Sequence, residues 1–418
     1  MGFDKKFFER GAFLAHQGQL WWTYLEQPAS TTQYLADCLA QGLAQCLGSR
    51  DDGDGSSREE SYLLLEEFYF RILQSWSYPH PLISPSEDQR SYLFTGVVFQ
   101  RTSIKELLSS SPFIMPLENQ AKPKLWLLNG WKGPNKNHFS EQWDWAQAKL
   151  AQKDLQKAVL IEASVCHLEA PLSLEEKEYL FRQLILRSWA YPQAWAYGVW
   201  WDQQGAMGLT PELLFEQQNQ NYVTMAVAGT RPLLPAVSDD LSSYRSSLVS
   251  PQGWGSKERK EHEIVVQDLV ARVSSFGSCE VQPYCQVNYP GLQHLCAVVT
   301  FYPSQGVTLG QLLQCLHPTS AMGLFPNNTE NYRSFSQLLA QKNRGWFGAP
   351  LVFQIEPSWA IAPVMIRGIF WNKDIIKIPA GVGVVLESNL ESEWQELLWK
   401  IDSVRGIFSL NDSSTCKI

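Results

Sequence analysis

Beyond residue 150, the apolar residues of the chain follow two different spacings. Residues 258–276 predict a helix, because apolar side chains recur there at the helical period and gather on one face. Residues 174–189 predict another helix, with Ser173 as its N-cap, and further helices are expected at 310–316 and 394–408. Apolar runs predict strands at 157–161, 194–201, 222–227, 297–302, 350–354, 360–370 and 375–385. Helices separated by runs of adjacent strands favour an α+β fold over a doubly wound one.

Two polar stretches interrupt the first part of the chain. Residues 49–60 and 128–141 are rich in loop-forming residues such as Gly, Asn and Asp, and both are expected to be loops. Neither is long enough to mark a boundary between domains. No internal repeat and no low-complexity tract divides the sequence.

The composition is that of a folded protein with an aromatic-rich core. Of the 418 residues, 44% are hydrophobic, 18% are charged and 17 are Trp. The net charge of −8 argues against a nucleic-acid partner, which requires a basic face. No apolar run is long enough to cross a bilayer or to act as a secretory signal. The eight cysteines show no Cys-x-x-Cys spacing and are expected to be reduced, so we expect a cytoplasmic protein.

Paired carboxylates stand at the start of two predicted helices. Glu258 and Glu261 are three residues apart and share a helix face, and Glu393 and Glu396 repeat this spacing, with Lys400 on the same face. Either pair alone is explained without a bound metal, because glutamates near the N-terminus of a surface helix interact favourably with the helix dipole. If both pairs face one cavity, their charges require a cation, and oxygen-only ligands favour magnesium or calcium over zinc.

Small residues and a histidine mark three further segments. The Ala-Gly-Thr-Arg-Pro turn at residues 228–232 and the Ala-Gly-Val-Gly run at 380–383 let backbone amides approach a ligand, although a structural bulge gives the same pattern. The His-Pro-Thr sequence at 317–319 is a rigid loop entry. Its histidine is either a catalytic group or a structural one.

Taken together and in this order, these segments resemble the chorismate-utilising enzymes. That family includes isochorismate synthases, salicylate synthases and the large subunits of anthranilate and aminodeoxychorismate synthases. The resemblance extends from about residue 157 to residue 400, and several motifs in order are far more specific than one. The matching segments are 157–160 (Lys-Ala-Val-Leu), 208–212 (Gly-Leu-Thr-Pro-Glu), 228–232, 258–262 (Glu-x-x-Glu-His), 293–295 (Gln-His-Leu), 317–326, 366–383 and 392–400.

The resemblance implies both a fold and a domain organisation. The fold is α+β, with two extensive antiparallel sheets packed face to face, helices outside and the active site in a deep cleft at the sheet edges. Residues 1–418 would form one such domain. The motif-poor residues 1–150 would contribute strands to both sheets, and residues 151–410 would carry the motifs.

The resemblance also implies a role for each matching side chain. Glu261 and Glu396 would bind Mg²⁺ directly, with Glu258 and Glu393 in support, and the metal would hold the ring carboxylate of chorismate. Glu212 would be the general acid that protonates the departing ring hydroxyl, which requires burial to raise its pKa. The substrate-binding residues would be Gly229, Thr230, His317, Phe347, Arg367, Gly383 and Lys400. No organic cofactor is implied.

Lys157 distinguishes between the subclasses of the family. Members that add water to chorismate carry a Lys at this position as the base, whereas members that add ammonia typically carry another residue. A lysine acts as a base only if its pKa falls well below its ordinary value, which burial achieves. The implied activity is therefore that of an isochorismate synthase, an isomerase that adds water to chorismate with loss of the ring hydroxyl. Its product would feed menaquinone or siderophore synthesis, since the site is the same in either pathway.

The sequence departs from the family pattern at a few positions. Phe347 replaces a Tyr whose hydroxyl would contact the substrate, and Glu162 stands where an Arg is usual. Thr210, Ser320 and Val352 are further departures. Two alternatives therefore stay open: a salicylate synthase, which also eliminates pyruvate, and a non-catalytic chorismate-binding paralogue. The sequence pattern specifies no oligomeric state.

Overall fold

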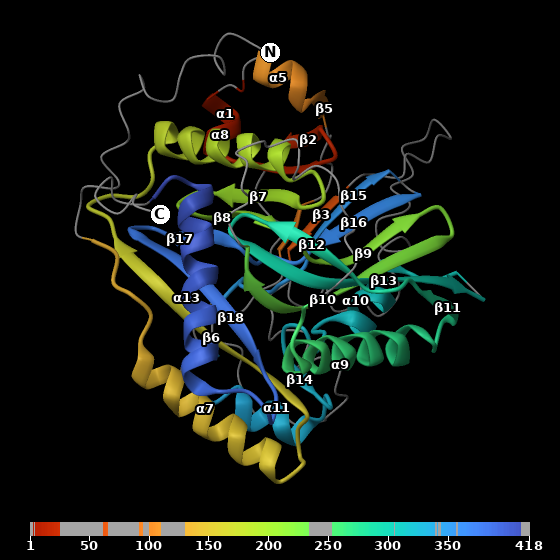
Figure 1. The fold of residues 1–418 in the computed structure, drawn as a ribbon. Helices are drawn as coiled ribbons and strands as arrows, with labels where there is room; N and C mark the ends of the chain where they lie inside the picture. Colours follow the sequence, from red (N-terminus) through yellow and green to blue (C-terminus); the bar gives the residue numbers. More distant parts are fainter. Residues whose placement is uncertain are drawn as a thin grey trace.

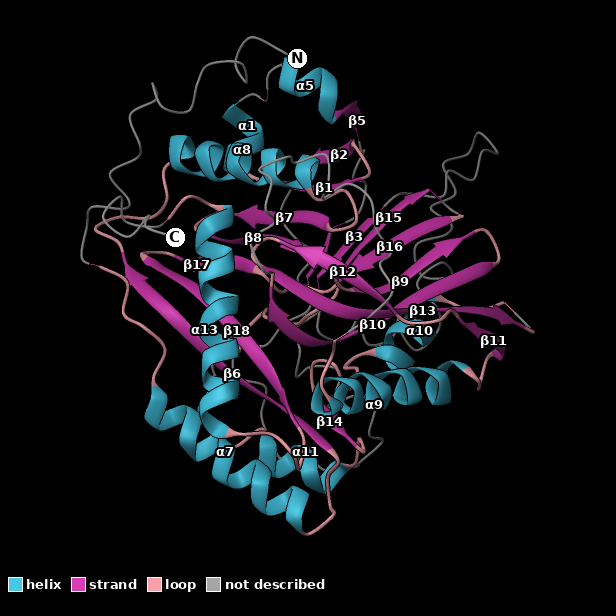
Figure 2. Cartoon of the chain, in the orientation of Figure 1, coloured by secondary structure: helices cyan, strands magenta, loops and turns pink. Residues whose placement is uncertain are grey.

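Two large antiparallel sheets with helices on the outside make up the protein, as the computed structural model shows (Figures 1 and 2). The structure describes residues 3, 5–25, 62–65, 92–94, 100–109, 130–233, 253–304, 306–338, 341, 344–356 and 358–410. The expected loop at 49–60 lies outside these residues. Among the described residues each sheet has nine strands, which confirms the predicted α+β fold. In the described part of the chain, no helix combines the length and apolar character that crossing a membrane requires.

The first sheet joins the beginning of the chain to its end. Its central strands come from the middle and the last third of the sequence, and its far edge is N-terminal. In order, the strands are β14 (Leu324–Phe325), β6 (Lys157–His167), β18 (Ile375–Val384), β17 (Gly368–Asn372), β8 (Gln204–Thr210), β7 (Trp195–Trp201), β1 (Gly11–His16), β2 (Gln19–Tyr24) and β5 (Gln100–Ser103).

The second sheet is assembled around β10 and β13, two long antiparallel strands that are distant in sequence. In order, its strands are β11 (Gly277–Val281), β13 (Leu292–Pro303), β10 (Asn221–Pro232), β9 (Leu213–Gln218), β16 (Trp359–Pro363), β15 (Leu351–Glu356), β3 (Tyr62–Leu65) and β4 (Tyr92–Phe94), with β12 (Cys285–Tyr289) also pairing with β13. Apolar side chains of β1, β7 and β8 pack against those of β9, β15 and β16, so the two sheets share a core.

Two of the points at which the chain crosses between the sheets lie side by side. Residues 211–212 lead from β8 to β9, and residues 364–367 lead back from β16 to β17. The predicted single strand 360–370 is therefore wrong: it is two strands of different sheets, and Arg367 lies between them with a positive φ of 56°. The apolar run continues across the crossing because both sheets are buried there, so hydrophobicity alone does not mark the break.

Helices cover the outer faces of both sheets. Helix α13 (Leu390–Ile407) packs across β18 and β6, and α9 (Ser256–Val273) packs on β10 and β13 (Figure 1). Helix α8 (Leu174–Ala190) lies against β7 and β8, and its predicted cap Ser173 forms a capping box with Glu176. The smaller helices are α1 (Lys5–Glu9), α5 (Ile104–Ser109), α10 (Leu309–Leu316) and α11 (Thr329–Phe335).

Helix α7 (Lys136–Ala151) occupies part of a stretch that the sequence predicts to be a loop. The prediction of a loop through residue 141 is wrong, because the helix begins at Lys136. The Asn135 side chain accepts hydrogen bonds from the backbone N–H groups of residues 137 and 138 and so caps the helix. The loop-forming residues at 128–135 therefore end at the N-cap of a helix. Phe139, in the first turn of this helix, lies on its buried face.

The side chain of Gln142 in α7 completes the exposed edge of β6. Among the described residues, β14 pairs with the first two residues of β6 and Lys132 bridges to Val165 near its other end, which leaves Ile161 between them without a strand partner on that side. Gln142 Nε2 donates to Ile161 O at 2.8 Å, and Ile161 N donates back to Gln142 Oε1 at 3.2 Å. A buried amide thus replaces a neighbouring strand, which attaches α7 to the sheet.

Replacing Gln142 by Leu should lower the free energy of unfolding by about 1–3 kcal/mol, because the buried N–H and C=O of Ile161 lose their partners. Denaturant titration followed by circular dichroism measures this loss. Glu141→Leu, on the exposed face of the same helix, is the control and should cost less than about 0.5 kcal/mol. Equal losses in the two variants would contradict the role given to the amide.

Candidate active site

A pocket lies where the two adjacent sheet crossings meet α9 and α13. Most of the residues implicated by the sequence line it, and they come from both sheets. The lining residues are Val159, Pro211, Glu212, Val227, Ala228, Gly229, Thr230, Glu261, His294, Ala321, Met322, Phe347, Ile366, Arg367, Pro379, Ala380, Gly381, Gly383 and Lys400. We call this the central pocket.

Glu212 and Arg367 occupy the two crossings and face the central pocket together. Val364 N donates to Glu212 O at 3.1 Å, and Leu209 N donates to Arg367 O at 3.2 Å, so the crossings are fixed side by side. Burial raises the pKa of Glu212 to about 7, although Lys157 and Arg367 act in the opposite direction. A carboxyl group of this kind holds a proton near neutral pH and can release it.

Arg367 is held by its neighbours in a strained backbone conformation. Its Nη2 donates to His294 Nε2 at 3.2 Å, and its guanidinium lies over the Tyr289 ring at 5.3 Å. Burial holds the pKa of His294 well below its usual range, so the ring is neutral and donates from Nδ1 to Gly229 O at 3.3 Å. In the described part of the chain, the buried Nη1 of Arg367 has no hydrogen-bond partner, which leaves it available to an anion in the pocket.

Lys157 begins β6 and lies directly behind the wall formed by Gly383 and Glu261. Its Nζ donates to Ser320 O at 2.8 Å and lies 3.5 Å from Glu261 Oε1, and the side chain is only 1% exposed. Burial lowers the pKa of Lys157, while Glu261 and Glu212 oppose this effect. Asp268 Oδ2 accepts from Ser320 N at 2.8 Å, so α9 fixes the carbonyl that holds the lysine.

Three of the four predicted metal-site glutamates gather beside the central pocket. Glu261 of α9 and Glu393 and Glu396 of α13 all approach Lys257 Nζ, at 3.2, 2.8 and 3.9 Å respectively. Glu258 differs: its Oε2 lies close to Gly255 at the N-terminus of α9 rather than beside Lys257. The helix-dipole explanation therefore fits Glu258, whereas Glu261, Glu393 and Glu396 form a cluster whose charges must be compensated.

The protonation of this cluster depends on its cations. Burial and the nearby Glu396 raise the pKa of Glu393 to about 7. Burial also acts to raise the pKa of Glu396, but Lys400, at 2.7 Å, and Lys257 outweigh it, so this pKa is lowered. Glu261 and Glu396 lie next to cations on two sides, while Glu393 depends mainly on Lys257.

The donor set of the cluster fits a hard divalent cation. Its ligand atoms are carboxylate oxygens, and Glu393 Oε2 is a buried oxygen without a hydrogen-bond partner among the described residues. In the same part of the chain, no three His, Cys, Asp or Glu side chains form a ready metal-binding group as they stand. The ammonium of Lys257 lies between the carboxylates instead.

Two glycines permit the close contacts of the site. Gly229 has a φ of +76° at the point where the pairing of β10 with β13 shifts register, so the predicted bulge is present. A Cβ on Gly383 would overlap Glu261 Oε1 and press on Lys157, so only glycine fits between the lysine and the pocket.

Of the remaining predicted residues, some line the central pocket and one does not. Thr230 lines the central pocket and places its Oγ1 3.3 Å from His294 Nδ1. His317 is buried at the end of α10 but does not line the pocket, whereas Ala321 and Met322 of its loop do. Lys400 lines the pocket and donates to Gly381 O at 2.7 Å.

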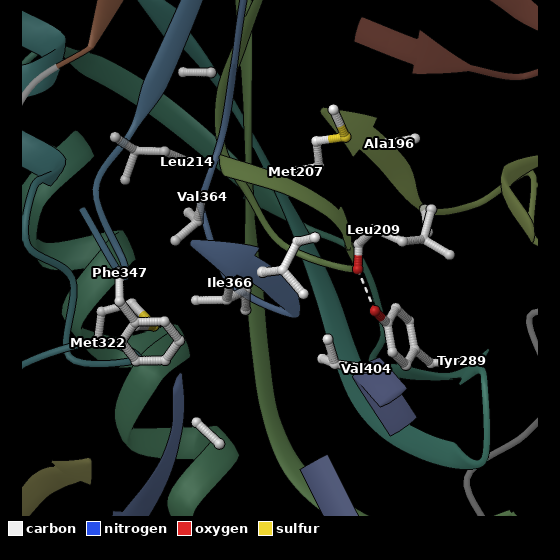
Figure 3. Packing of buried hydrophobic residues seen from close by; sticks show 14 of the residues in the cluster. Ala196, Met207, Leu209, Leu214, Tyr289, Met322, Phe347, Val364, Ile366 and Val404 are labelled. Atoms are coloured by element: carbon white, nitrogen blue, oxygen red, sulfur yellow. Dashed lines mark hydrogen bonds between the residues drawn. The ribbon is translucent and has the colours of Figure 1, made fainter. Parts of the chain in front are cut away.

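Phe347 lies in the wall of the central pocket, and Glu162 lies away from it. Phe347 packs beside Met322 and close to Ile366 (Figure 3), and Arg344 Nε donates to its carbonyl at 2.9 Å. Glu162 Oε2 instead accepts from Asn135 N at 3.4 Å at the N-terminus of α7, where a carboxylate is favourable. Of these two departures from the family pattern, only Phe347 touches the site.

Three residues that shape the site are not predicted from the sequence: Lys257, Asp268 and His294. His294 positions Arg367, and the sequence indicates it only as part of a short motif. The spacing of Lys257 could have predicted its contact with Glu261, because it stands four residues before Glu261 on the same helix face. Asp268 and His294 act through contacts with Ser320 and Arg367, which are distant in sequence, so no local spacing reveals them.

Several known proteins are similar to this chain in sequence. A family model described as chorismate binding enzyme matches residues 75–406. The anthranilate synthase component 1 of Saccharolobus solfataricus is 25% identical over 218 residues, which cover 51% of this chain and 50% of that protein. The isochorismate synthase MenF of Escherichia coli is 24% identical over 288 residues, which cover 66% of this chain and 61% of that protein. The chain thus spans 50% and 61% of the length of these two curated relatives.

A solved structure has the same fold over its whole length. A Bacillus anthracis protein put forward as a 2,3-dihydroxybenzoate-specific isochorismate synthase superposes with a TM-score of 0.70 at 18% identity, covering 97% of both chains. At this identity the likeness shows the fold alone. The family model reaches further, because it matches the sequence itself from residue 75 to residue 406, and on that match the chain belongs to the family of chorismate binding enzymes.

Proposed function

We propose that the protein is a magnesium-dependent isochorismate synthase. The observation that carries the proposal is the pairing of two buried groups: Lys157, of lowered pKa, lies behind the wall of the central pocket, and Glu212, of raised pKa, lines that pocket. Adding water and removing a hydroxyl requires one group that takes a proton and another that gives one. Relatives named as isochorismate synthases support the same assignment.

The pocket offers two cations to a dicarboxylate such as chorismate. Arg367 presents a guanidinium whose Nη1 makes no hydrogen bond among the described residues, and Lys400 presents an ammonium. An arginine binds a carboxylate through two parallel hydrogen bonds, while a lysine acts as a point charge. Glu261 and Glu396 would bind magnesium with Glu393 in support, whereas Glu258 lies at the N-terminus of α9. The metal would neutralise the ring carboxylate.

The two central side chains divide the proton transfers between them. Neutral Lys157 takes a proton from the water whose oxygen adds to one ring carbon, and protonated Glu212 gives a proton to the hydroxyl that departs from another as water. The ring double bonds shift between these carbons, so chorismate and its product have the same atoms. The reaction is an isomerisation and requires no oxidant or organic cofactor.

A lysine in the position of the base favours water over ammonia as the nucleophile. Pyruvate release would move the assignment to a salicylate synthase, which shares these residues. A non-catalytic chorismate-binding protein is the second candidate, and Phe347 favours it, because this side chain lines the pocket without a hydroxyl. The product would feed menaquinone or siderophore synthesis.

Incubation with chorismate and magnesium should yield isochorismate without pyruvate. Lys157→Met should lower kcat by about 100-fold or more, because the general base is lost. Chromatography of the products, with and without a chelator, is the measurement, and Lys153→Met, on an exposed lysine of the same region, is the control. Bound chorismate without any product would reject the enzyme and favour the binding protein.

The raised pKa of Glu212 gives a dependence of stability on pH that needs no substrate. The carboxyl is protonated in the folded protein up to about pH 7 but ionises at its ordinary value of 4.5 when unfolded. Stability is therefore fully present below the lower value and is lost as pH rises through the higher one. Relative to Glu212→Gln, the wild type should lose about 1–3 kcal/mol between these limits.

Denaturant titrations of the wild type, Glu212→Gln and the exposed control Glu263→Gln at several pH values measure this difference. The control should follow the wild type. In kinetic assays the same protonation should make kcat/KM fall as pH rises through about 7, since the general acid is lost. A stability difference independent of pH would contradict the raised pKa.

Phe347→Tyr should lower the KM for chorismate by roughly 2- to 10-fold, because a hydroxyl at the pocket wall adds a hydrogen bond worth about 0.5–1.5 kcal/mol. Steady-state kinetics are the measurement, and Phe276→Tyr, a partly exposed position outside the pocket lining, is the control. A higher KM in Phe347→Tyr would mean that the wall has no room for the hydroxyl.

A further inference from the structure

The ammonium of Lys257 is shared by all three clustered glutamates. It extends from the first turn of α9 and reaches Glu393 of α13 at 2.8 Å, so it also joins the two helices. Its side chain is 16% exposed, whereas those of the glutamates are 2–7% exposed. Within the described residues, Lys400 contacts only Glu396 of the three and Lys157 only Glu261.

We propose that Lys257 is an internal counter-ion that competes with the divalent metal for these carboxylates, an inference that rests on the metal site of the proposed function. Three buried carboxylates repel one another and require a cation. Lys257 supplies it from within the chain, and magnesium would supply it from solution. Either cation satisfies the same oxygens, so each excludes the other.

Geometry makes the two occupants mutually exclusive. A magnesium ion binds oxygens at about 2.1 Å and requires them to converge on one point. The Lys257 ammonium, at 2.8 Å from Glu393 and 3.2 Å from Glu261, occupies the space between the same oxygens. Two cations so close together would repel each other strongly at a buried site. Metal binding therefore requires the lysine side chain to swing out.

The lysine is suited to such an exchange. Its long, flexible stem starts in the first helical turn, and its partial exposure provides a path to solvent. Burial acts to lower its pKa, but Glu261, Glu396 and Glu393 outweigh this and raise it, so Lys257 is charged throughout the working pH range. The cluster is thus compensated whether or not a metal is bound, and the apparent metal affinity is reduced by the contacts that Lys257 gives up.

Isothermal titration of magnesium into metal-free protein tests the competition directly. Lys257→Met keeps the length of the side chain and removes its charge, and it should bind magnesium about tenfold more tightly than the wild type. Lys260→Met, an exposed lysine on the same helix, is the matched control and should bind as the wild type does. Equal or weaker binding by Lys257→Met overturns the proposal.

A second measurement uses the wild type and does not depend on the folding of a variant. Lysine acetylation is followed by mass spectrometry with and without magnesium. Lys257 should react slowly without magnesium and about tenfold faster with it, since the swing exposes its amine, while Lys260 should react equally in both. A Lys257 reactivity that magnesium leaves unchanged or lowers overturns the proposal.

Neither measurement involves chorismate, which separates this inference from the proposed function. A protein that converts chorismate but shows no difference between Lys257→Met and the wild type keeps the function and loses the competition. Tighter magnesium binding by Lys257→Met in a protein that leaves chorismate unchanged supports the competition and removes the function. Wild type and Lys257→Met that both bind no magnesium overturn the competition together with the metal requirement.

Discussion

The site depends on two hydrogen bonds that fix the neighbouring crossings between the sheets, from Val364 N to Glu212 O and from Leu209 N to Arg367 O. Each crossing carries a charged side chain out of one sheet as the chain enters the other. Because the crossings are bonded to each other, the acid and the anion-binding arginine are fixed together without a loop of their own. Arg367 keeps a positive φ there, and its contacts with His294 and Tyr289 offset that strain.

One physical cause prepares both proton-transfer groups. Burial disfavours any charged form, so it lowers the pKa of Lys157 and raises that of Glu212. Burial thereby favours the neutral form of the lysine, which can act as a base, and the protonated form of the glutamate, which can act as an acid. In the carboxylate cluster burial acts in the same direction and raises the pKa of Glu393 to about 7, but Lys400 and Lys257 lower the pKa of Glu396. The neighbouring lysines therefore decide which carboxyl groups of the cluster keep their charge.

Sequence patterns predict helices α8, α9, α10 and α13 and most of the strands that the structure describes beyond residue 150, as well as several residues that line the pocket. They miss helix α11 and strands β8, β9, β11, β12 and β14. Sequence patterns fail where one structural element ends and another begins without a change in the pattern of apolar residues. Apart from Arg367, the run 360–370 is apolar although it belongs to two sheets, and the turn-rich stretch before α7 gives no sign that Asn135 caps this helix. Asp268 and His294 act only through distant partners, which a single sequence does not connect.

Most of the departures from the family pattern affect the packing of the protein rather than its catalytic groups. Glu162 accepts a hydrogen bond at the start of α7, so its charge stabilises a helix end and does not reach the substrate. Ser320 offers only backbone atoms to Asp268 and Lys157, and Val352 is a buried residue of β15, so neither side chain enters the pocket. Phe347 alone changes a surface that a ligand would touch. Glu162, Thr210, Ser320 and Val352 are all absent from the pocket lining, so these four departures leave the acid, the base and the carboxylates in place. Phe347 is therefore the departure that would change how the protein binds its substrate.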